Sequence, residues 1–349
     1  MSAHAFQRLV LGCIMVPLPA VALTMDFVPV GNPGNAADPA NSGSVPGIGT
    51  VNVTFGIGTY EVTNAQYVEF LNSVDQTGAN ALALYDAQMG STAWGGILFN
   101  AGAANGAKFS IRTGFDNMPV VYLSFFDAAR FTNWLHNGQG GGSTETGAYT
   151  FTGGTSTPGN ASTVTRNTGA KFWLPSESEW YKAAYHQPVG LGGTASNYWV
   201  FPMQTDLEPF SDQPPGATPD NTRVGNFFKS DGINNGYDDG YVVPFDHVQN
   251  NLTAVGAYTQ SKSFYGTFDL GGNVSEWNDS TDGIGGRGVR GGAWDGSSVN
   301  QRASSRSFFD GSGAGNTVGF RVATVPEPSV IGLAISALLG LAFRRNKRA

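Results

Sequence analysis

Three short stretches of this sequence carry the apolar spacing of an amphipathic helix, and glycine-rich segments separate them. Each stretch opens on a Ser or Thr suited to cap a helix, at Thr63, Ser124 and Ser176. Gln66 and Glu179 follow the first and third caps at the spacing of a capping box. The 49 glycines among the 349 residues favour turns over further regular elements. We therefore expect an irregular α+β domain with low regular secondary structure.

The same stretches indicate which side chains pack inside. Each stretch has an aromatic residue at helical spacing from its other apolar residues, namely Phe70, Phe131 and Trp180. We expect these side chains to face a core. Residues 137–169, between the second and third helices, are rich in Gly, Ser and Thr. This composition predicts a surface excursion, with a hairpin near Tyr149.

Residues 1–22 have the pattern of a secretory signal peptide. The only charge is Arg8, an apolar run follows, and the small residues 20–22 form a cleavage site. The alternative, a buried N-terminal element, is opposed by Pro17 and Pro19. Cys13, the one cysteine of the sequence, lies within this segment. Once the segment is removed, the protein has no disulfide, no thiolate nucleophile and no cysteine metal ligand.

The end of the sequence, residues 326–349, resembles a PEP-CTERM sorting tail of Gram-negative bacteria. Pro326, Glu327 and Pro328 precede 14 apolar or small residues, 330–343, and then a basic cluster. As a helix this run is about 21 Å long, short for a hydrocarbon core of about 30 Å. The resemblance implies recognition by an exosortase, with removal of the tail. An ordinary C-terminal membrane anchor is the alternative, and both place the domain outside the cytoplasm.

Charge excludes one class of partner. Residues 23–325 contain 25 acidic and 14 basic residues, because one acid and five bases of the whole sequence lie outside them, so the net charge is 14 − 25 = −11. Such a domain has no basic stripe, and we expect no nucleic-acid binding. An acidic domain attracts divalent cations instead.

Six segments occur in the order found in the formylglycine-generating enzyme, or sulfatase-modifying factor, family. They are "YEVTNAQYVEFLN", "MPVVYLSFFDAARFTNWL", "FWLPSESEWYKAA", "GNVSEW", "RGVRGGAW" and "VGFRVA". The resemblance covers residues 55–323. It implies a compact α+β domain over residues 23–325 that is related to C-type lectins and stabilised by calcium.

Two structural calcium sites are implied by this resemblance. The first consists of the Asn273 and Glu276 side chains with the carbonyl of Val274. Calcium takes six to eight hard oxygen ligands of these kinds, and neighbouring glycines let a loop wrap around it. The alternative makes Asn273 a turn former and Glu276 a surface residue.

The second implied site lies in "GNFFKSDGINNGYDDGY". Its ligands by resemblance are the side chains of Asn226 and Asp239 and the carbonyls of Phe227 and Tyr241. This segment is longer than usual for the family, so Asp238 is an alternative to Asp239.

The chemistry of the family is where the sequence departs from its pattern. Aerobic formylglycine-generating enzymes oxidise a cysteine of a client sulfatase with O₂, using copper held by two cysteines. Here the first of these positions falls on Gly296 and the second lies between Ser298 and Gln301. None of these residues offers the soft thiolate that Cu(I) prefers. We therefore expect no copper, and no residue is assigned a catalytic role.

Other chemistries lack the residues they need. Some relatives bind non-haem iron through three histidines, but His136, His186 and His247 show no close ligand spacing. The serines at 297 and 298 have no neighbouring histidine or lysine base. We expect Arg302 and Arg306, like Arg290 and Arg321, to pair with acids inside the fold.

Two classes of function remain. The first is an exported, calcium-binding and non-catalytic module at the cell surface that binds exopolysaccharide or a surface protein. Aromatic residues around Trp94 and within 196–202 either stack on sugars or close the core. The alternative is an oxidoreductase of the formylglycine-generating or non-haem iron superfamily with altered, cysteine-independent chemistry.

Overall fold

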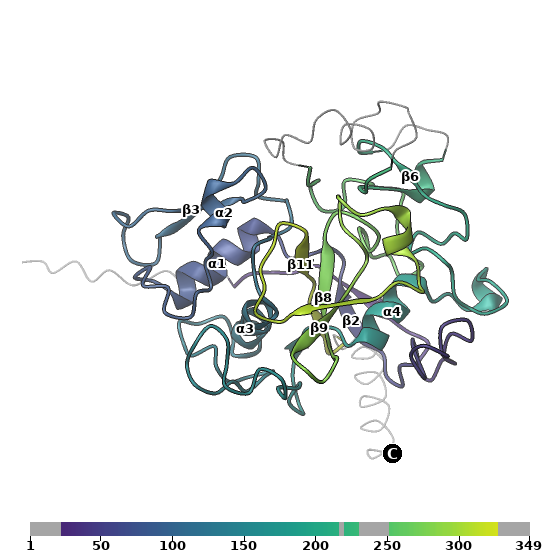
Figure 1. The fold of residues 1–349 in the computed structure, drawn as a ribbon, viewed down its shortest axis with the longest axis horizontal. Helices are drawn as coiled ribbons and strands as arrows, with labels where there is room; N and C mark the ends of the chain where they lie inside the picture. The colour runs from purple at the N-terminus through teal and green to yellow at the C-terminus, as the bar shows by residue number, and fades with distance from the viewer. Residues whose placement is uncertain (1–21, 216–219, 230–250, 327–349) are drawn as a thin grey trace, which may run out of the picture.

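The computed structural model describes residues 22–215, 220–229 and 251–326 (Figure 1). The architecture is α+β with low regular secondary structure, which confirms the predicted fold class. The α-helices of the described residues are α1 (Asn64–Val74), α2 (Gln88–Ser91), α3 (Phe125–His136) and α4 (Glu177–Tyr185). Three single 3₁₀ turns are η1 (Val189–Leu191), η2 (Asn221–Arg223) and η4 (Ser298–Gln301).

The three predicted helix starts are confirmed. Thr63, Ser124 and Ser176 are the N-caps of α1, α3 and α4, and each side chain accepts a hydrogen bond from the N–H three residues on. In each case the side chain at that third position returns a bond to the N–H of the cap. Local sequence therefore determines where these helices begin, since a capping box satisfies donors that the helix itself leaves unpaired.

The first sheet has four antiparallel strands in the order β1-β2-β12-β5. They are β1 (Phe27–Val30), β2 (Phe55–Gly58), β12 (Ala323–Thr324) and β5 (Phe172–Trp173). β2 and β12 lie near opposite ends of the described sequence, so their pairing joins segments that are far apart along the chain.

The second sheet has the order β10-β9-β8-β11 and carries the candidate site. Its strands are β8 (Ser275–Thr281), β9 (Gly286–Arg290), β10 (Ser307–Asp310) and β11 (Val318–Phe320). β11 runs parallel to β8, with Gly319 opposite Glu276. In Figure 1, β8 and β9 lie in the middle of the view, with α1 and α3 on one side and α4 on the other.

Two short ladders complete the strands of the described residues. One is the antiparallel pair β3 (Ile97–Phe99) and β4 (Phe109–Ile111), and the other is the parallel pair β6 (Phe210–Ser211) and β7 (Val224–Gly225).

Aromatic side chains form much of the core. Phe131 of α3 contacts Phe70 of α1 at 5.5 Å and Phe320 of β11 at 5.4 Å between ring centroids. Trp94 is buried and stacks on Trp294 at 5.6 Å. The predicted helix faces are thus core faces, and the loop around Trp94 closes the core.

Residues 137–169 are only partly the surface excursion that their composition predicts. Tyr149 and Phe151 are buried, and Tyr149 forms an isolated bridge with Arg166 instead of a local hairpin. The side chain of Asn133 on α3 holds Tyr149 in the core through hydrogen bonds to the main chain of this loop. Its Nδ2 donates to the carbonyls of Thr144 and Tyr149, and its Oδ1 accepts from the N–H of Tyr149 at 2.7 Å. Hydrogen bonds to a buried amide on α3 therefore fix part of this polar loop against the core.

No helix in the described part of the chain is long and apolar enough to span a bilayer. The predicted signal segment and sorting tail fall outside the described residues, apart from Ala22 and Pro326.

Replacing Ser176 with Ala tests the capping of α4. The variant loses the acceptor that holds the N–H of Glu179 at 3.2 Å, so we expect the free energy of unfolding to fall by about 1 kcal/mol. Urea unfolding measures this change. The matched control is Ser162→Ala, at an exposed serine outside any helix. Equal midpoints for the two variants would contradict the assignment.

Candidate functional site

A fully buried ion pair lies at the centre of the predicted calcium-binding segment. Glu276 is the second residue of β8 and Arg321 directly follows β11, and neither side chain is exposed. The Nε of Arg321 lies 2.5 Å from Oε2 of Glu276, and its Nη2 lies 2.6 Å from Oε1. The indole N–H of Trp180 also donates to Oε2, at 2.7 Å. The carboxylate is therefore satisfied by protein donors on both oxygens.

Arg321 also donates hydrogen bonds to two main-chain carbonyls. Its Nη1 donates to the carbonyl of Gly58 at 2.9 Å, and its Nη2 donates to that of Phe268 at 3.0 Å. Buried arginines persist only where such partners are present. The expectation that Arg321 pairs with an acid is confirmed.

Asn273 occupies a tight turn beside this pair. Its backbone is in the left-handed region, with φ of 60°. Its Nδ2 donates to Oε1 of Glu61 at 3.0 Å, and its Oδ1 accepts from the N–H and hydroxyl of Thr253 and from Nδ2 of Asn226 at 3.3 Å. Asn226 and Asn273, which the family resemblance assigns to separate calcium sites, are thus in direct contact.

The Asn226 side chain has unused capacity. Its Nδ2 donates to the carbonyl of Asn251 at 2.7 Å, whereas its buried Oδ1 has no hydrogen-bond partner among the described residues. The carbonyl of Phe227 accepts from the hydroxyl of Ser211. Asp239 and Tyr241, the other predicted ligands, lie outside the described residues. A buried amide oxygen without a donor is the kind of ligand that calcium takes.

These contacts test how well the predicted residues fit calcium. Asn226 fits, because its Oδ1 is free. Oδ1 of Asn273 lies beside it but already accepts from Asn226 and from two groups of Thr253. Glu276 presents no free carboxylate oxygen, because Arg321 and Trp180 hold both. Calcium coordination stays a prediction, and the geometry favours the amide oxygen of Asn226 over the oxygens of Asn273 and Glu276, which protein donors already occupy.

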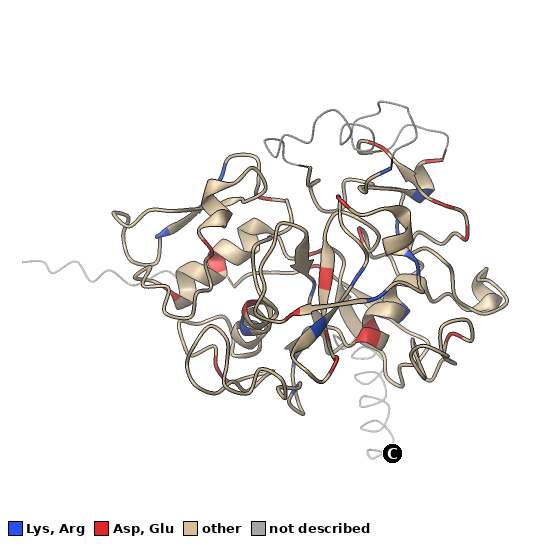
Figure 2. Ribbon diagram, viewed as in Figure 1, with Lys and Arg blue, Asp and Glu red and all other residues tan. Residues whose placement is uncertain are grey.

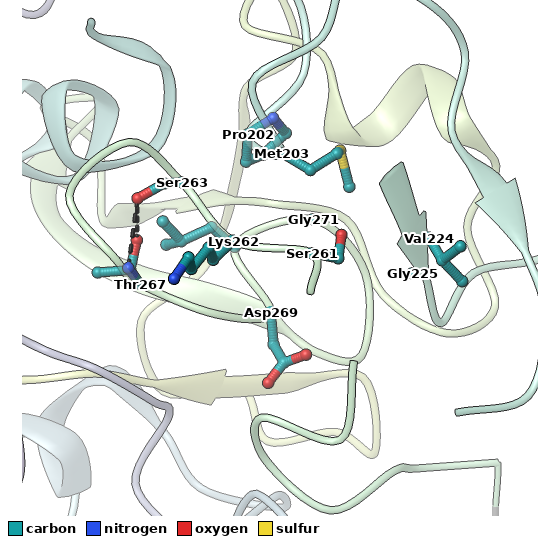
Figure 3. A pocket seen from close by; sticks show the side chains of 11 residues that line it. Pro202, Met203, Val224, Gly225, Ser261, Lys262, Ser263, Thr267, Asp269 and Gly271 are labelled. Carbon is teal, nitrogen blue, oxygen red and sulfur yellow. Dashed lines mark hydrogen bonds between the residues drawn. The ribbon is translucent and has the colours of Figure 1, made fainter. Parts of the chain in front are cut away.

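A small polar cavity of about 10 Å³ lies between the two predicted calcium segments (Figure 3). It is lined on one side by Val224 and Gly225 and on the other by the backbone region that carries Asp269. The hydroxyls of Ser263 and Thr267, joined at 2.6 Å, close another wall. This volume is close to that of one water-sized sphere.

Sequence analysis missed two acids of this region, Glu61 and Asp269. Burial raises the pKa of Glu61 well above its ordinary value, and the charge of Asp269 adds to the effect. Burial raises the pKa of Asp269 to about 6, although this carboxylate accepts the N–H of Gly256 at 2.5 Å. Their positions could have indicated them, because Glu61 lies in the family segment "YEVTN" and Asp269 lies shortly before the family segment "GNVSEW", in "DLGGNVSEW". Both acids are withdrawn from water, and the nearby guanidinium of Arg321 opposes the rise of each pKa.

A separate cleft of about 240 Å³ is formed by the segment that stands in place of the copper-binding cysteines. Asp295, Gly296 and Asn300 line it from one side, and Arg306 and Phe309 line it from the other. Burial raises the pKa of Asp295 above its ordinary value. Gly296, on which the family resemblance puts the first cysteine position, is one of the residues that line this cleft.

The second position, between Ser298 and Gln301, is the 3₁₀ turn η4. The Ser298 hydroxyl donates to Oε1 of Glu208 at 2.6 Å, and Val299 is largely exposed. Gln301 is buried, and its side-chain amide has no hydrogen-bond partner among the described residues. The described lining of the cleft contains hydroxyl, amide, carboxylate and guanidinium groups, and no histidine, lysine or cysteine.

The arginines of this region divide into two groups. Glu177 of α4 forms ion pairs with Arg290 at 2.7 Å and with Arg306 at 2.6 Å, as expected. Figure 2 shows acidic and basic residues close together around α4, β8 and β9. Arg302 contradicts the expectation of a buried acid partner. It is exposed, lies over the Phe201 ring at 5.5 Å and pairs with no carboxylate of the described residues. The turn η4 directs its side chain outward, which sequence spacing did not indicate.

The two histidines of the described residues have separate partners. His136 accepts the N–H of Lys171 at 3.0 Å, His186 bonds to the hydroxyl of Tyr265 at 2.8 Å, and His247 lies outside the described residues. Within the described ranges, no three residues of His, Cys, Asp or Glu gather in a way that would hold a metal ion. Burial and the neighbouring Lys182 lower the pKa of His186 to about 4.

Fold and cleft together define an α+β domain of formylglycine-generating type whose cysteine positions carry no thiol. The Sulfatase-modifying factor enzyme 1-like domain matches residues 24–325, and the chain belongs to this family. The fold is similar to that in the structure titled "Crystal Structure of CarF", with a TM-score of 0.53 and 19% identity over 87% of this chain and 99% of that one.

Two further structures show weaker similarity. PvdO from Pseudomonas aeruginosa has 16% identity over 88% of this chain and 94% of its own, with a TM-score of 0.43. Treponema denticola variable protein 1 has 19% identity over 78% and 85%, with a TM-score of 0.40. No curated protein matches the sequence.

Replacing Arg321 with Met tests the central ion pair. The variant leaves Glu276 as a buried charge without its partner, so we expect the free energy of unfolding to fall by about 3–5 kcal/mol. Chemical unfolding measures the loss. The double variant Glu276→Gln/Arg321→Met should recover part of it, because no uncompensated charge remains. Arg302→Met, at an exposed arginine, is the control, and an equal loss in both single variants would contradict the assignment.

His186 predicts a loss of stability in mild acid. Its pKa is near 4 in the folded chain and about 6.5 when unfolded, so its contribution is complete above pH 6.5 and is lost as the pH falls toward 4. We expect the wild type to lose stability relative to His186→Gln between pH 7 and 4.5, by on the order of 1 kcal/mol. Urea unfolding across this range measures the difference. A gap that does not change with pH would show that the imidazole is not protonated differently on folding.

Proposed function

We propose that this protein is an exported, calcium-binding domain of the sulfatase-modifying factor family that binds a partner at the cell surface and does not carry out copper-dependent oxidation. One observation carries the proposal. The cleft that Gly296 and Asn300 line holds the segment in which the family places its cysteines, and no sulfur is available there. Cu(I) binding needs soft ligands, whereas the polar groups of this lining are hard oxygen and nitrogen groups.

The groups of the cleft suit recognition better than bond cleavage. A nucleophilic serine needs a neighbouring base, and the described lining has none. Arg306 is held in place by Glu177 and points a partly exposed cation toward the cleft. Asn300 is fixed as well, because its Oδ1 accepts the N–H of Ser297 at 3.1 Å. Fixed donors and acceptors of this kind set the orientation of a bound group.

Calcium would serve the scaffold in this proposal. The free oxygen of Asn226 and the carbonyls of Phe227 and Val274 would hold the ion, which supplies positive charge beside Glu61 and Asp269. Oδ1 of Asn273 would join them in exchange for its hydrogen bonds from Thr253. The support is the unpartnered oxygen of Asn226 and the raised pKa of the two acids. The family resemblance implies two ions, one at Asn273, Val274 and Glu276 and one at Asn226, Phe227, Asp239 and Tyr241. We propose one ion at the described ligands, because Asn226 and Asn273 are in direct contact.

Export and partners rest on the two ends of the sequence. The signal pattern of residues 1–22 and the sorting tail of residues 326–349 support passage across a membrane, transient anchoring through the tail and processing by an exosortase. We propose exopolysaccharide or a surface protein as the partner, and no nucleic acid, because residues 23–325 carry a net charge of 14 − 25 = −11.

Metal analysis of the protein purified from the cells that produce it tests this proposal. We expect bound calcium and no stoichiometric copper or iron. Chelation should lower the melting temperature, because an ion bound only by the folded state stabilises it, by about 2.7 kcal/mol at one hundred times its Kd.

The variant Asn226→Ala should abolish the calcium-dependent part of the stability. Its matched control is Asn167→Ala, which removes a side-chain amide that bonds to Gly147 and Thr150 far from the predicted site, so the calcium-dependent shift should remain. Stoichiometric copper or iron would overturn the proposed function. A melting temperature that chelation leaves unchanged would overturn the calcium assignment.

A further inference from the structure

A second groove, of about 320 Å³, lies away from the cleft. Four parts of the chain form it: the N-terminal loop at Asp38–Asn41, Asp206, the loop that follows α4 at residues 194–200, and residues 302–304 after η4. The N–H of Ala303 donates to the carbonyl of Val200 at 2.9 Å and fixes the last two segments together. The volume is at the lower end of the range for small-molecule sites, about 300–1,000 Å³.

The rim of this groove carries polar groups with free capacity. Arg302 is exposed, and among the described residues its guanidinium contacts only the Phe201 ring. Asp206 is exposed too, and accepts a single bond, from the N–H of Val200 to Oδ1 at 3.0 Å. Asn41 uses its Nδ2 on Asp38 and Tyr181, which leaves its amide oxygen available. A guanidinium, a carboxylate and an amide oxygen therefore line one groove without pairing with one another.

The floor is rigid and partly apolar. Tyr198 is buried, and its hydroxyl donates to the carbonyl of Ala36 at 2.7 Å. Trp199 is half-buried, and its indole N–H donates to Oε1 of Gln187 at 2.9 Å. Both aromatic residues line the groove and are held before any ligand arrives, so a ligand would order few side chains.

We propose that this groove binds a neutral sugar unit, and this inference rests on the proposed binding function. A sugar ring has apolar C–H surface and a rim of hydroxyls, which matches an aromatic floor beside planar polar groups. The free oxygen of Asp206 accepts from hydroxyls, and Arg302 donates to hydroxyl or ring oxygens. The net charge of −11, from 14 bases and 25 acids in residues 23–325, opposes the approach of an anionic polymer and so favours a neutral one.

A glycan array of neutral hexose and N-acetylhexosamine oligosaccharides, probed with the full chain purified from its producing cells, tests the proposal. Titration with the oligosaccharide that binds best then gives Kd for the wild type and for Asp206→Asn and Arg302→Gln. We expect each variant to weaken binding at least tenfold. Both sites are exposed, so the fold should persist, and circular dichroism checks this.

The matched controls are Asp116→Asn and Lys171→Gln, at exposed charges outside the groove, and these should bind as the wild type does. Sugar binding that the groove variants leave unchanged would overturn the groove assignment while leaving a binding module intact. Binding of free amino acids or peptide ends in place of sugars, or no binding to any neutral glycan, would overturn the inference. The metal analysis reports separately on the proposed function.

Discussion

The ion pair between Glu276 and Arg321 is the interaction on which the rest of the structure depends. A carboxylate and a guanidinium that are both fully withdrawn from water cost several kcal/mol each unless every donor and oxygen is matched. The match here draws on β8, on the residue after β11, on Trp180 of α4 and on the carbonyls of Gly58 and Phe268. These groups lie as far apart in sequence as 263 residues, between Gly58 and Arg321. A polar centre therefore joins segments that short strands alone would hold weakly.

The turn before Glu276 depends on the close approach of two main-chain segments. Gly272 has φ of 96°, and a Cβ at this position would lie 2.3 Å from the carbonyl oxygen of Asn226. Only glycine permits both the left-handed backbone and this close approach. The contact lets the N–H of Asn273 donate to that carbonyl at 2.8 Å and brings the two asparagines together. The polar cluster thus depends on the absence of a side chain as much as on the amides themselves.

Local features of this fold could be predicted from the sequence, and long-range ones could not. The capping boxes at Thr63 and Ser176 depend on residues three apart, so the spacing determined the helix starts. The contact of Glu61 with Asn273 spans 212 residues, and no periodicity encodes it. Composition predicted Tyr149 to be at the surface, whereas the Asn133 amide, 16 residues earlier on α3, holds it in the core. Arg302 and Arg306, four residues apart, have opposite environments, which the turn η4 determines.

The short segment after η4 connects the two surfaces that could hold ligands. Arg302, Ala303 and Ser304 line the groove, and Ser305 and Arg306 line the cleft. Glu177 holds Arg306 from one side, and Arg290 holds the carbonyls of Ala303 and Ser305 at 3.1 and 2.6 Å. The segment therefore has one direct bond to α4, from Arg306 to Glu177, and two bonds to Arg290 of β9, which itself binds Glu177. Its backbone has little freedom to shift, so a ligand in the groove meets side chains that are already in place.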